Sequence, residues 1–307
     1  MTILLRSAAL AAAVTLLPAA GFAQTQLGRT DSVFTWQGAL PASALLTVRN
    51  FNGPIAVRPA SGDKLEFRAE KRTSRGGGSL SDVAFDIRRE NGGDITICST
   101  LRDADPCDGD RRWGRHDSDD DRRNVTVAMT LLVPRGARVK LTTGNGALAV
   151  EGVGADVQAT TGNGRVRIVG TEGSVRVTTG NGEVEVRDAK APVKVTTGNG
   201  DVTVTTAEGP VEARSGNGDI DVRISALRAK ESMSFSTGSG SVRVTLPASY
   251  NGELDASTGN GDLRSDFELR IQGRMNPRRI RATIGEGGAL LRLSTGNGGL
   301  EVRKAER

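Results

Sequence analysis

The chain has 307 residues, a formal net charge of +5 and a sequence pI of about 9.6, and only 3% of its residues are aromatic. With 40 glycines and so few aromatics, its core has to be built from small branched aliphatic side chains. The basic residues are scattered among Asp and Glu and do not form a basic block with interleaved aromatics, which argues against nucleic-acid binding.

The first 23 residues have the layout of a cleaved signal peptide. Arg6 precedes an apolar run from Ser7 to Leu17, and small residues then lead to a cleavage site after Ala23. The run is too short for a transmembrane span, and no second apolar stretch of spanning length follows. We therefore expect an exported protein without a transmembrane segment, in the periplasm, at the cell surface or secreted.

Residues 24–44 are expected to form an N-terminal cap or linker, and residues 45–303 a single β-solenoid domain. Phe34, Trp36 and Leu40 are candidates to cover its first rung, because an exposed strand edge recruits other chains. The first strands are expected at Leu45–Val48, Pro54–Arg58, Lys64–Lys71, Val83–Arg88, Asp94–Cys98 and Asn124–Val133.

Residues 102–123 form a charged insertion with eight Asp and six Arg. A solvated loop whose arginines neutralise its aspartates is the favoured interpretation, and opportunistic calcium binding and a partner site are the alternatives. Cys98 and Cys107 are expected to form a disulfide in an oxidising compartment, with two free thiols as the alternative. The C-x8-C spacing with the single His116 is not a zinc pattern.

The middle of the chain repeats T-G-N-G at a fixed interval. The Gly that opens each Gly-Asn-Gly recurs every 18 residues, and looser copies follow at Gly238, Gly259 and Gly296. The strict copies open at Gly144, Gly162, Gly180, Gly198 and Gly216. A weaker turn halfway divides each step into two nine-residue units, each with a turn and a short strand.

Apolar and polar residues alternate along each short strand, as in Val166-Arg167-Ile168, which indicates strands buried on one face. A strict 18-residue return favours a coil in which each rung lies about 4.8 Å from the last. The sequence therefore predicts an all-β parallel β-solenoid, or β-helix, with two short strands per rung. Its winding is expected to be right-handed, the usual hand of parallel crossovers.

The Gly-Asn-Gly segments are interpreted as structural corners, because Gly and Asn tolerate positive φ and every rung has one. A backbone cradle for an anion is the alternative. Stacking places the asparagines in a column whose amides can hydrogen-bond, and Thr143, Thr161, Thr179 and Thr197 form a column beside it. The expected turn ladder consists of Asn145, Asn163, Asn181, Asn199 and Asn217.

A nine-residue period is also typical of calcium-binding β-rolls. The position that holds the calcium-binding Asp in a β-roll is occupied here by Val166, Val184, Val202 and Ile220. Calcium requires several oxygen ligands, so no metal site is predicted in the rungs, and no cofactor or catalytic residue is predicted anywhere.

Four motifs resemble a bacterial adhesin-like β-repeat family, a domain of unknown function (DUF4097-like). They are N-G-x-I-x-V near residue 52, LLVPRGARVKLTTGNG at 131–146, the repeated T-G-N-G-x-V-x-V, and IGEGGALLRLSTGNG at 284–298. The resemblance covers about residues 45–303 and implies an exported parallel β-helical protein, with adhesion as a role by analogy. It implies no catalytic residues, and the 102–123 insertion with its cysteines departs from the pattern.

The leading functional hypothesis is a non-enzymatic binding or structural module of the cell envelope, with an unidentified protein or polysaccharide as its ligand. One face steps from Arg165 and Arg167 through Glu183 to Asp219, and this graded surface either meets a partner or only maintains solubility. A polysaccharide-active enzyme is an alternative, because Glu183, Asp201 and Asp219 would lie about 5 Å apart. A periplasmic scaffold or stress-related module is another.

Overall fold

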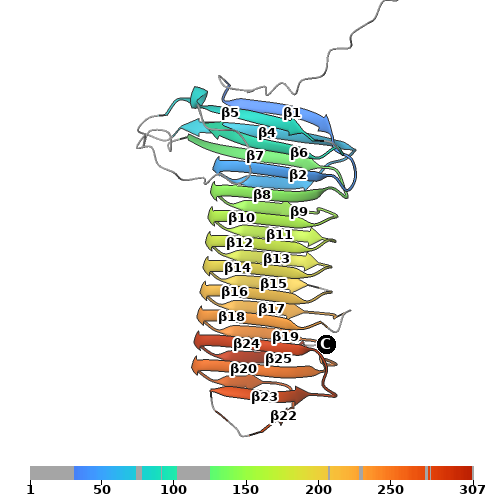
Figure 1. Cartoon of the computed structure of the whole chain (residues 1–307), viewed down its shortest axis with the longest axis vertical. Coiled ribbons are helices and arrows are strands. Elements are labelled where there is room, and N and C mark those ends of the chain that lie inside the picture. The colour runs from blue at the N-terminus through green and yellow to red at the C-terminus, as the bar shows by residue number, and fades with distance from the viewer. Residues whose placement is uncertain are drawn as a thin grey trace, which may run out of the picture.

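The protein is a flat coil in which two long β-sheets face each other (Figure 1). The computed structural model describes residues 31–73, 78–90, 92–101, 125–206, 208–227, 231–273, 276 and 278–305. Within these ranges its one helical element is the short 3-10 helix Leu80–Asp82, and no helix is long and apolar enough to cross a membrane. The predicted all-β parallel solenoid with two short strands per rung is confirmed.

Sheet A has thirteen strands. In spatial order they are β22 (Leu269–Ile271), β23 (Arg279–Ile284), β20 (Gly252–Asn260), β24 (Leu290–Asn297), β18 (Met233–Ser239), β16 (Val211–Asn217), β14 (Val193–Asn199), β12 (Val175–Asn181), β10 (Val157–Asn163), β8 (Arg138–Asn145), β2 (Leu45–Asn52), β6 (Ile95–Leu101) and β5 (Val83–Arg89).

Sheet B has twelve strands. In spatial order they are β1 (Val33–Ala39), β4 (Lys64–Thr73), β7 (Val125–Val133), β3 (Ile55–Pro59), β9 (Leu148–Glu151), β11 (Val166–Thr171), β13 (Val184–Ala189), β15 (Val202–Thr206), β17 (Ile220–Ile224), β19 (Val242–Leu246), β25 (Leu300–Lys304) and β21 (Leu263–Ser265).

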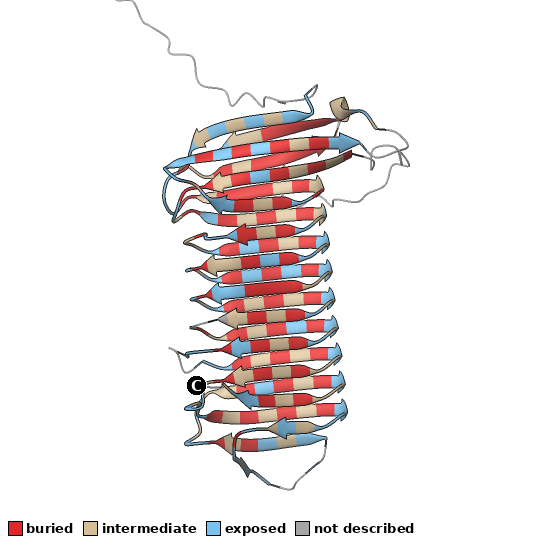
Figure 2. Ribbon diagram, turned by 180° about the vertical axis from the view of Figure 1, so that it is seen from behind, coloured by how far each residue is buried: buried red, intermediate tan, exposed pale blue. Residues whose placement is uncertain are grey.

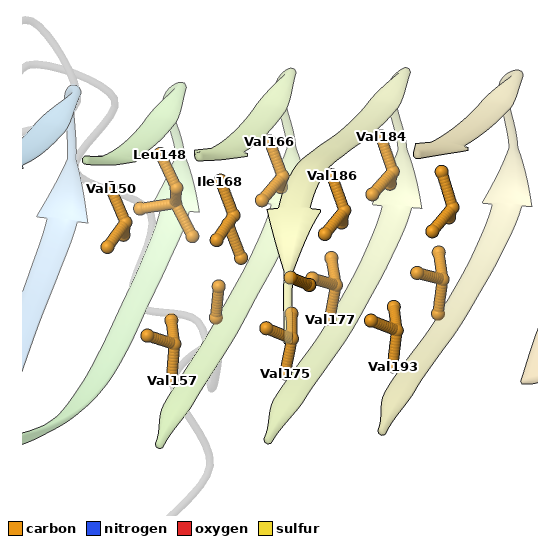
Figure 3. Packing of buried hydrophobic residues seen from close by; sticks show 14 of the residues in the cluster. Leu148, Val150, Val157, Val166, Ile168, Val175, Val177, Val184, Val186 and Val193 are labelled. Atoms are coloured by element: carbon orange, nitrogen blue, oxygen red, sulfur yellow. The ribbon is translucent and has the colours of Figure 1, made fainter. Parts of the chain in front are cut away.

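A thin aliphatic core fills the space between the sheets. Figure 3 shows Val166 and Ile168 of β11 facing Val175 and Val177 of β12, and all four are at most 1% exposed. A similar alternation of buried and more exposed residues is visible along many strands of the coil in Figure 2. Full burial of such a side chain contributes about 1.5–3 kcal/mol. Every rung has only a few of them, so it depends on its neighbours for stability.

The corners require glycine because the neighbouring rung lies so close. A Cβ added at Gly180 would lie 2.6 Å from the carbonyl oxygen of Gly162, one rung away. Gly182, two residues later, has a φ of 156°, in the region that side chains disfavour. Asn181, between them, is the last residue of β12 and does not have a positive φ, contrary to the role predicted for asparagine at this turn.

The rungs do not stack in chain order at the two ends of the coil, contrary to the prediction that each rung lies on the last. At the C-terminal end, the last rung, β24 with β25, is inserted between β18/β19 and β20/β21. At the N-terminal end, the first rung, β2 with β3, lies between β6/β7 and β8/β9. The first and the last rung are therefore each held between neighbours on both sides.

Antiparallel strands cap both ends of the coil. β5 pairs with β6 and β4 pairs with β7, and β23 pairs with β20 at the other end. Phe34 of β1 stacks on Phe85 with the ring centroids 5.0 Å apart, and Phe67 packs edge-on against Phe85. Phe34 thus covers the antiparallel cap, whereas the predicted position for it was the first parallel rung.

Several predicted features lie outside the described residues. These are the signal peptide at 1–23, the charged insertion at 102–123 and Cys107. Cys98 is fully buried on β6, which ends at Leu101 directly before the insertion. The pairing of Cys98 with Cys107 stays a prediction.

Candidate binding surface

The five predicted ladder asparagines lie in one column along the edge of sheet A. The Nδ2 of Asn163 donates to the Oδ1 of Asn145 at 2.7 Å, and the same bond repeats at every rung up to Asn217. Asn163, Asn181 and Asn199 each use one N–H group and the oxygen within the column, whereas Asn145 only accepts and Asn217 only donates. The second N–H group of the three inner amides has no partner among the described residues.

The neighbouring threonines stack in register but do not bond to each other. Thr161 and Thr197, both at most 3% exposed, donate to the carbonyl oxygens of Gly146 and Gly182 in the preceding rung. These buried threonines thus fix the corners. The adjacent Thr160 and Thr178 occupy the outward positions of the same strands.

The outer face of sheet B consists of an ion-pair network. Arg167 and Arg187 both contact Glu185, which is only 8% exposed, and the Arg167–Glu185 distance is 3.1 Å. Farther along, Arg243 lies between Asp221 at 3.4 Å and Glu301 at 2.8 Å. The hydrogen bond from Arg243 is the main cause that lowers the pKa of Glu301. The predicted graded charge surface is therefore a set of mutually neutralised pairs.

The carboxylates considered for an enzyme are used within the coil. Glu183 pairs with Arg165 at 2.6 Å. Asp201 accepts the backbone N–H of Asp219 at 2.8 Å, and Asp219 accepts that of Ser241 at 2.7 Å. Each carboxylate therefore contributes to the contact between rungs.

The outer face of sheet A has a different chemistry. Across β8, β10, β12 and β14 its first outward column has three cations, and its second has only threonines. We call these eight residues the basic face: Lys140, Gln158, Arg176, Lys194, Thr142, Thr160, Thr178 and Thr196. A row of glycines without side chains, Gly144 to Gly198, separates this face from the asparagine column.

The basic face contains uncompensated positive charge. Lys140 and Arg176 form no salt bridge with any described residue. Lys194 pairs at 2.8 Å with Glu212 on β16, which Arg214 also contacts at 2.8 Å. The hydrogen bond from Lys194 is the main cause that lowers the pKa of Glu212, so this carboxylate stays ionised near neutral pH.

One hollow opens where the chain departs from the 18-residue repeat. It has a volume of about 360 Å³, and its lining includes Ser225, Glu231, Tyr250 and Asn251. Burial raises the pKa of Tyr250 to about 12, so its hydroxyl stays protonated at neutral pH. Glu231 is the single carboxylate among the described residues of this lining.

The rungs offer no calcium site. The side chains at the β-roll ligand position, Val166, Val184, Val202 and Ile220, are buried in the core. Among the described residues no cluster of His, Cys, Asp or Glu is suited to hold a metal ion. The charged insertion at 102–123 lies outside them, so its calcium hypothesis is untested.

Comparison with known proteins identifies the family. No curated protein matches the chain. Among solved structures, a "putative cell adhesion protein" from Clostridium sporogenes is 10% identical, with a TM-score of 0.28, over 89% of this chain and 100% of its own. A "putative adhesin" from Bacteroides fragilis is 10% identical, with a TM-score of 0.42, over 90% of this chain and 99% of its own. The Toastrack DUF4097 family model matches residues 46–303, and the chain therefore belongs to this family.

Proposed function

We propose that the protein is an exported, non-enzymatic binding module of the cell envelope that acts in an adhesin-like way. The observation that carries the proposal is the outer face of sheet A. Its strands β8 to β16 are in register, so each outward position recurs once per rung. Such a face suits an extended ligand that makes the same contact many times, because weak contacts add up when they are held on one scaffold.

The polar groups of the rungs support a binding role over a catalytic one. Glu183, Asp201 and Asp219 are engaged by Arg165 or by backbone N–H groups. Repeated columns offer equivalent positions on every rung, whereas an active site needs one set of groups that differs from its surroundings. We assign the protein to the cell surface or the periplasm on the basis of its N-terminal sequence.

Protease treatment of intact and lysed cells, followed by immunoblotting, tests this proposal. An adhesin-like role predicts degradation on intact cells, together with reduced attachment of a deletion strain to a surface coated with envelope or matrix polymers. Re-expression of the wild-type chain should restore attachment. Protection until lysis, with unchanged attachment, would reject the adhesin-like role and leave a periplasmic scaffold.

A reducing-end assay on the same polysaccharides separates the enzyme alternative. We expect no release of reducing ends by the purified chain. Release that disappears in a Glu183→Gln variant would contradict the non-enzymatic assignment. The matched control is Glu151→Gln, which removes a carboxylate from the same face at the end of β9, where it pairs with Arg58 at 3.7 Å.

A further inference from the structure

We propose that the basic face of sheet A binds a linear acidic polysaccharide, with its carboxylates along the column of cations and its hydroxyls against the threonine and asparagine columns. This inference rests on the proposed binding role and specifies its ligand. The polymer would lie along the axis of the coil, across β8, β10, β12 and β14.

The first argument is the absence of acid from this face. All residues of β8, β10, β12 and β14 are described, and none of their outward positions carries a carboxylate. On sheet B, in contrast, Arg167 and Arg187 share Glu185, and Arg243 lies between two carboxylates. On sheet A the nearest acid in this column is Glu212 of β16, which pairs with Lys194, so Lys140 and Arg176 are the cations of this face without a salt bridge to a described residue.

The second argument is an unfavourable contact that a ligand would relieve. Arg176 and Lys194 are direct partners on neighbouring parallel strands, and Lys140 lies two rungs from Arg176 with Gln158 between them. Like charges directly opposite each other destabilise a strand pair. Glu212 compensates Lys194 from the next strand, so a polyanion would add its attraction mainly at Lys140 and Arg176, whereas the ion pairs on sheet B are already formed.

The third argument concerns the kind of polyanion. Cations recur along the axis at intervals of about 5 and 10 Å, the spacing of one and two rungs. The outward hydroxyls of Thr142, Thr160, Thr178 and Thr196 have no hydrogen-bond partner among the described residues. A polymer that carries both carboxylates and hydroxyls matches these columns. The face has no aromatic side chain on which nucleic-acid bases would stack, which disfavours a nucleic acid.

Binding of polygalacturonate oligomers to the purified mature chain, followed by titration calorimetry, tests this inference. We expect saturable binding that weakens between about 50 and 200 mM salt, because salt screens exposed charges. Neutral dextran of the same length should not bind. No binding of polygalacturonate at low salt, or equal binding of dextran, would overturn the inference.

Matched double variants locate the site. Lys140→Gln with Arg176→Gln removes two charges from the basic face and is expected to weaken binding about tenfold, equivalent to about 1.4 kcal/mol. Arg223→Gln with Arg303→Gln removes two charges from the ion pairs of sheet B and is expected to change binding less than about twofold. Equal losses in both variants would show an effect of net charge alone and would overturn the assignment.

A third variant tests the hydroxyls without changing charge. Thr160→Val with Thr178→Val keeps the β-branched shape on β10 and β12, so the fold should persist, as circular dichroism can verify. We expect a loss of about threefold for polygalacturonate and none for polyphosphate, which has no hydroxyl groups along its chain. An unchanged affinity for polygalacturonate would show that the basic face binds polyanions in general, and it would overturn the assignment of a polysaccharide ligand.

The outcomes distinguish this inference from the proposed function. Protection of the protein in intact cells together with polygalacturonate binding would reject adhesion and keep the ligand. Exposure at the surface together with reduced attachment of the deletion strain, but without polygalacturonate binding by the purified chain, would keep adhesion and reject the ligand.

Discussion

The side-chain amide of Asn260 donates a hydrogen bond to the Oδ1 of Asn297 at 2.8 Å, although Asn297 lies 37 residues later in the chain. Asn297 in turn lies beside Ser239 in the register of β24 with β18. The last rung is thus an interior rung, and Asn297 occupies the corner position out of chain order, with Ser239 between it and Asn217. The rung formed by β24 and β25 therefore connects the C-terminal cap to the strict repeats by pairing with strands on both sides.

Deletion of residues 289–307 should therefore be far more damaging than loss of an ordinary terminal rung. It removes β24, which lies between β18 and β20 in sheet A, and β25, which lies between β19 and β21 in sheet B. We expect the variant to lose cooperative urea unfolding, or to aggregate through its newly exposed strand edges.

The control is an internal deletion of similar size. Removal of residues 175–192 takes out one strict rung and brings β14 next to β10, with Val193 opposite Val157 as Val175 was before. We expect this variant to fold, with a free energy of unfolding lowered on the order of 2 kcal/mol, because only one interface between rungs is lost. An equal loss of stability in the two deletion variants would contradict a connecting role for β24 and β25.

Asn181 tests the polarity of the amide ladder. It donates to Asn163 and accepts from Asn199, both at 2.7 Å. Asn181→Ala should cost about 1–2 kcal/mol, because two exposed hydrogen bonds are lost. Asn181→Asp should cost more at pH 7 than at pH 3, because an ionised carboxylate cannot donate to Asn163 whereas a protonated one can. Urea unfolding of the wild type and both variants at the two pH values measures these losses. If Asn181→Asp lowers stability equally at both pH values, the direction of the hydrogen bonds in the ladder does not contribute to stability.

Gly182→Ala should be among the most harmful single substitutions in the rungs. The added Cβ would overlap the carbonyl oxygen of Gly164, and the residue has a φ of 156°. We expect a loss of at least about 3 kcal/mol in the free energy of unfolding. Gly62→Ala is the control, since nothing lies within 4 Å of its added Cβ, and it should change stability by less than about 0.5 kcal/mol. Similar losses at both positions would refute the close-approach explanation.

The strict rungs were predictable from the sequence because their two signals agree. The 18-residue return sets the coil, and the alternation in segments such as Val184-Glu185-Val186 decides which face is buried. The asparagine column follows from the same period. No local signal could predict the position of β24, because its L-R-L-S-T-G-N-G segment fits beside any rung, and its place depends on the antiparallel cap formed by β22 and β23.

The functional surface was harder to predict for a related reason. The sequence order of Arg165, Glu183 and Asp219 indicates a gradient along one face, but ion pairs depend on which charges are neighbours across rungs and on how their side chains turn. The basic face gives no local sequence signal, because Lys140, Arg176 and Lys194 are dispersed along the sequence at multiples of the repeat. Successive repeats laid in register place Lys140, Arg176 and Lys194 in one column, in which Glu212 is the next residue.

Lys71 should make stability depend on pH in the N-terminal cap. It is 3% exposed, donates to the carbonyl oxygens of Leu80 and Val83, and lies 5.5 Å from the centre of the Phe85 ring. Burial lowers the pKa of Lys71 to about 8, from an ordinary value of 10.5. Between these values the unfolded chain binds the proton more tightly than the folded chain, so stability rises as the pH increases through the folded pKa. We expect a gain of about 2 kcal/mol between pH 7.5 and 9.5, measured by urea unfolding. Lys71→Met should be less stable overall, because the hydrogen bonds from Lys71 to the carbonyl oxygens of Leu80 and Val83 are lost, but it should lack this rise. A rise of the same size in both proteins would assign the effect to other groups.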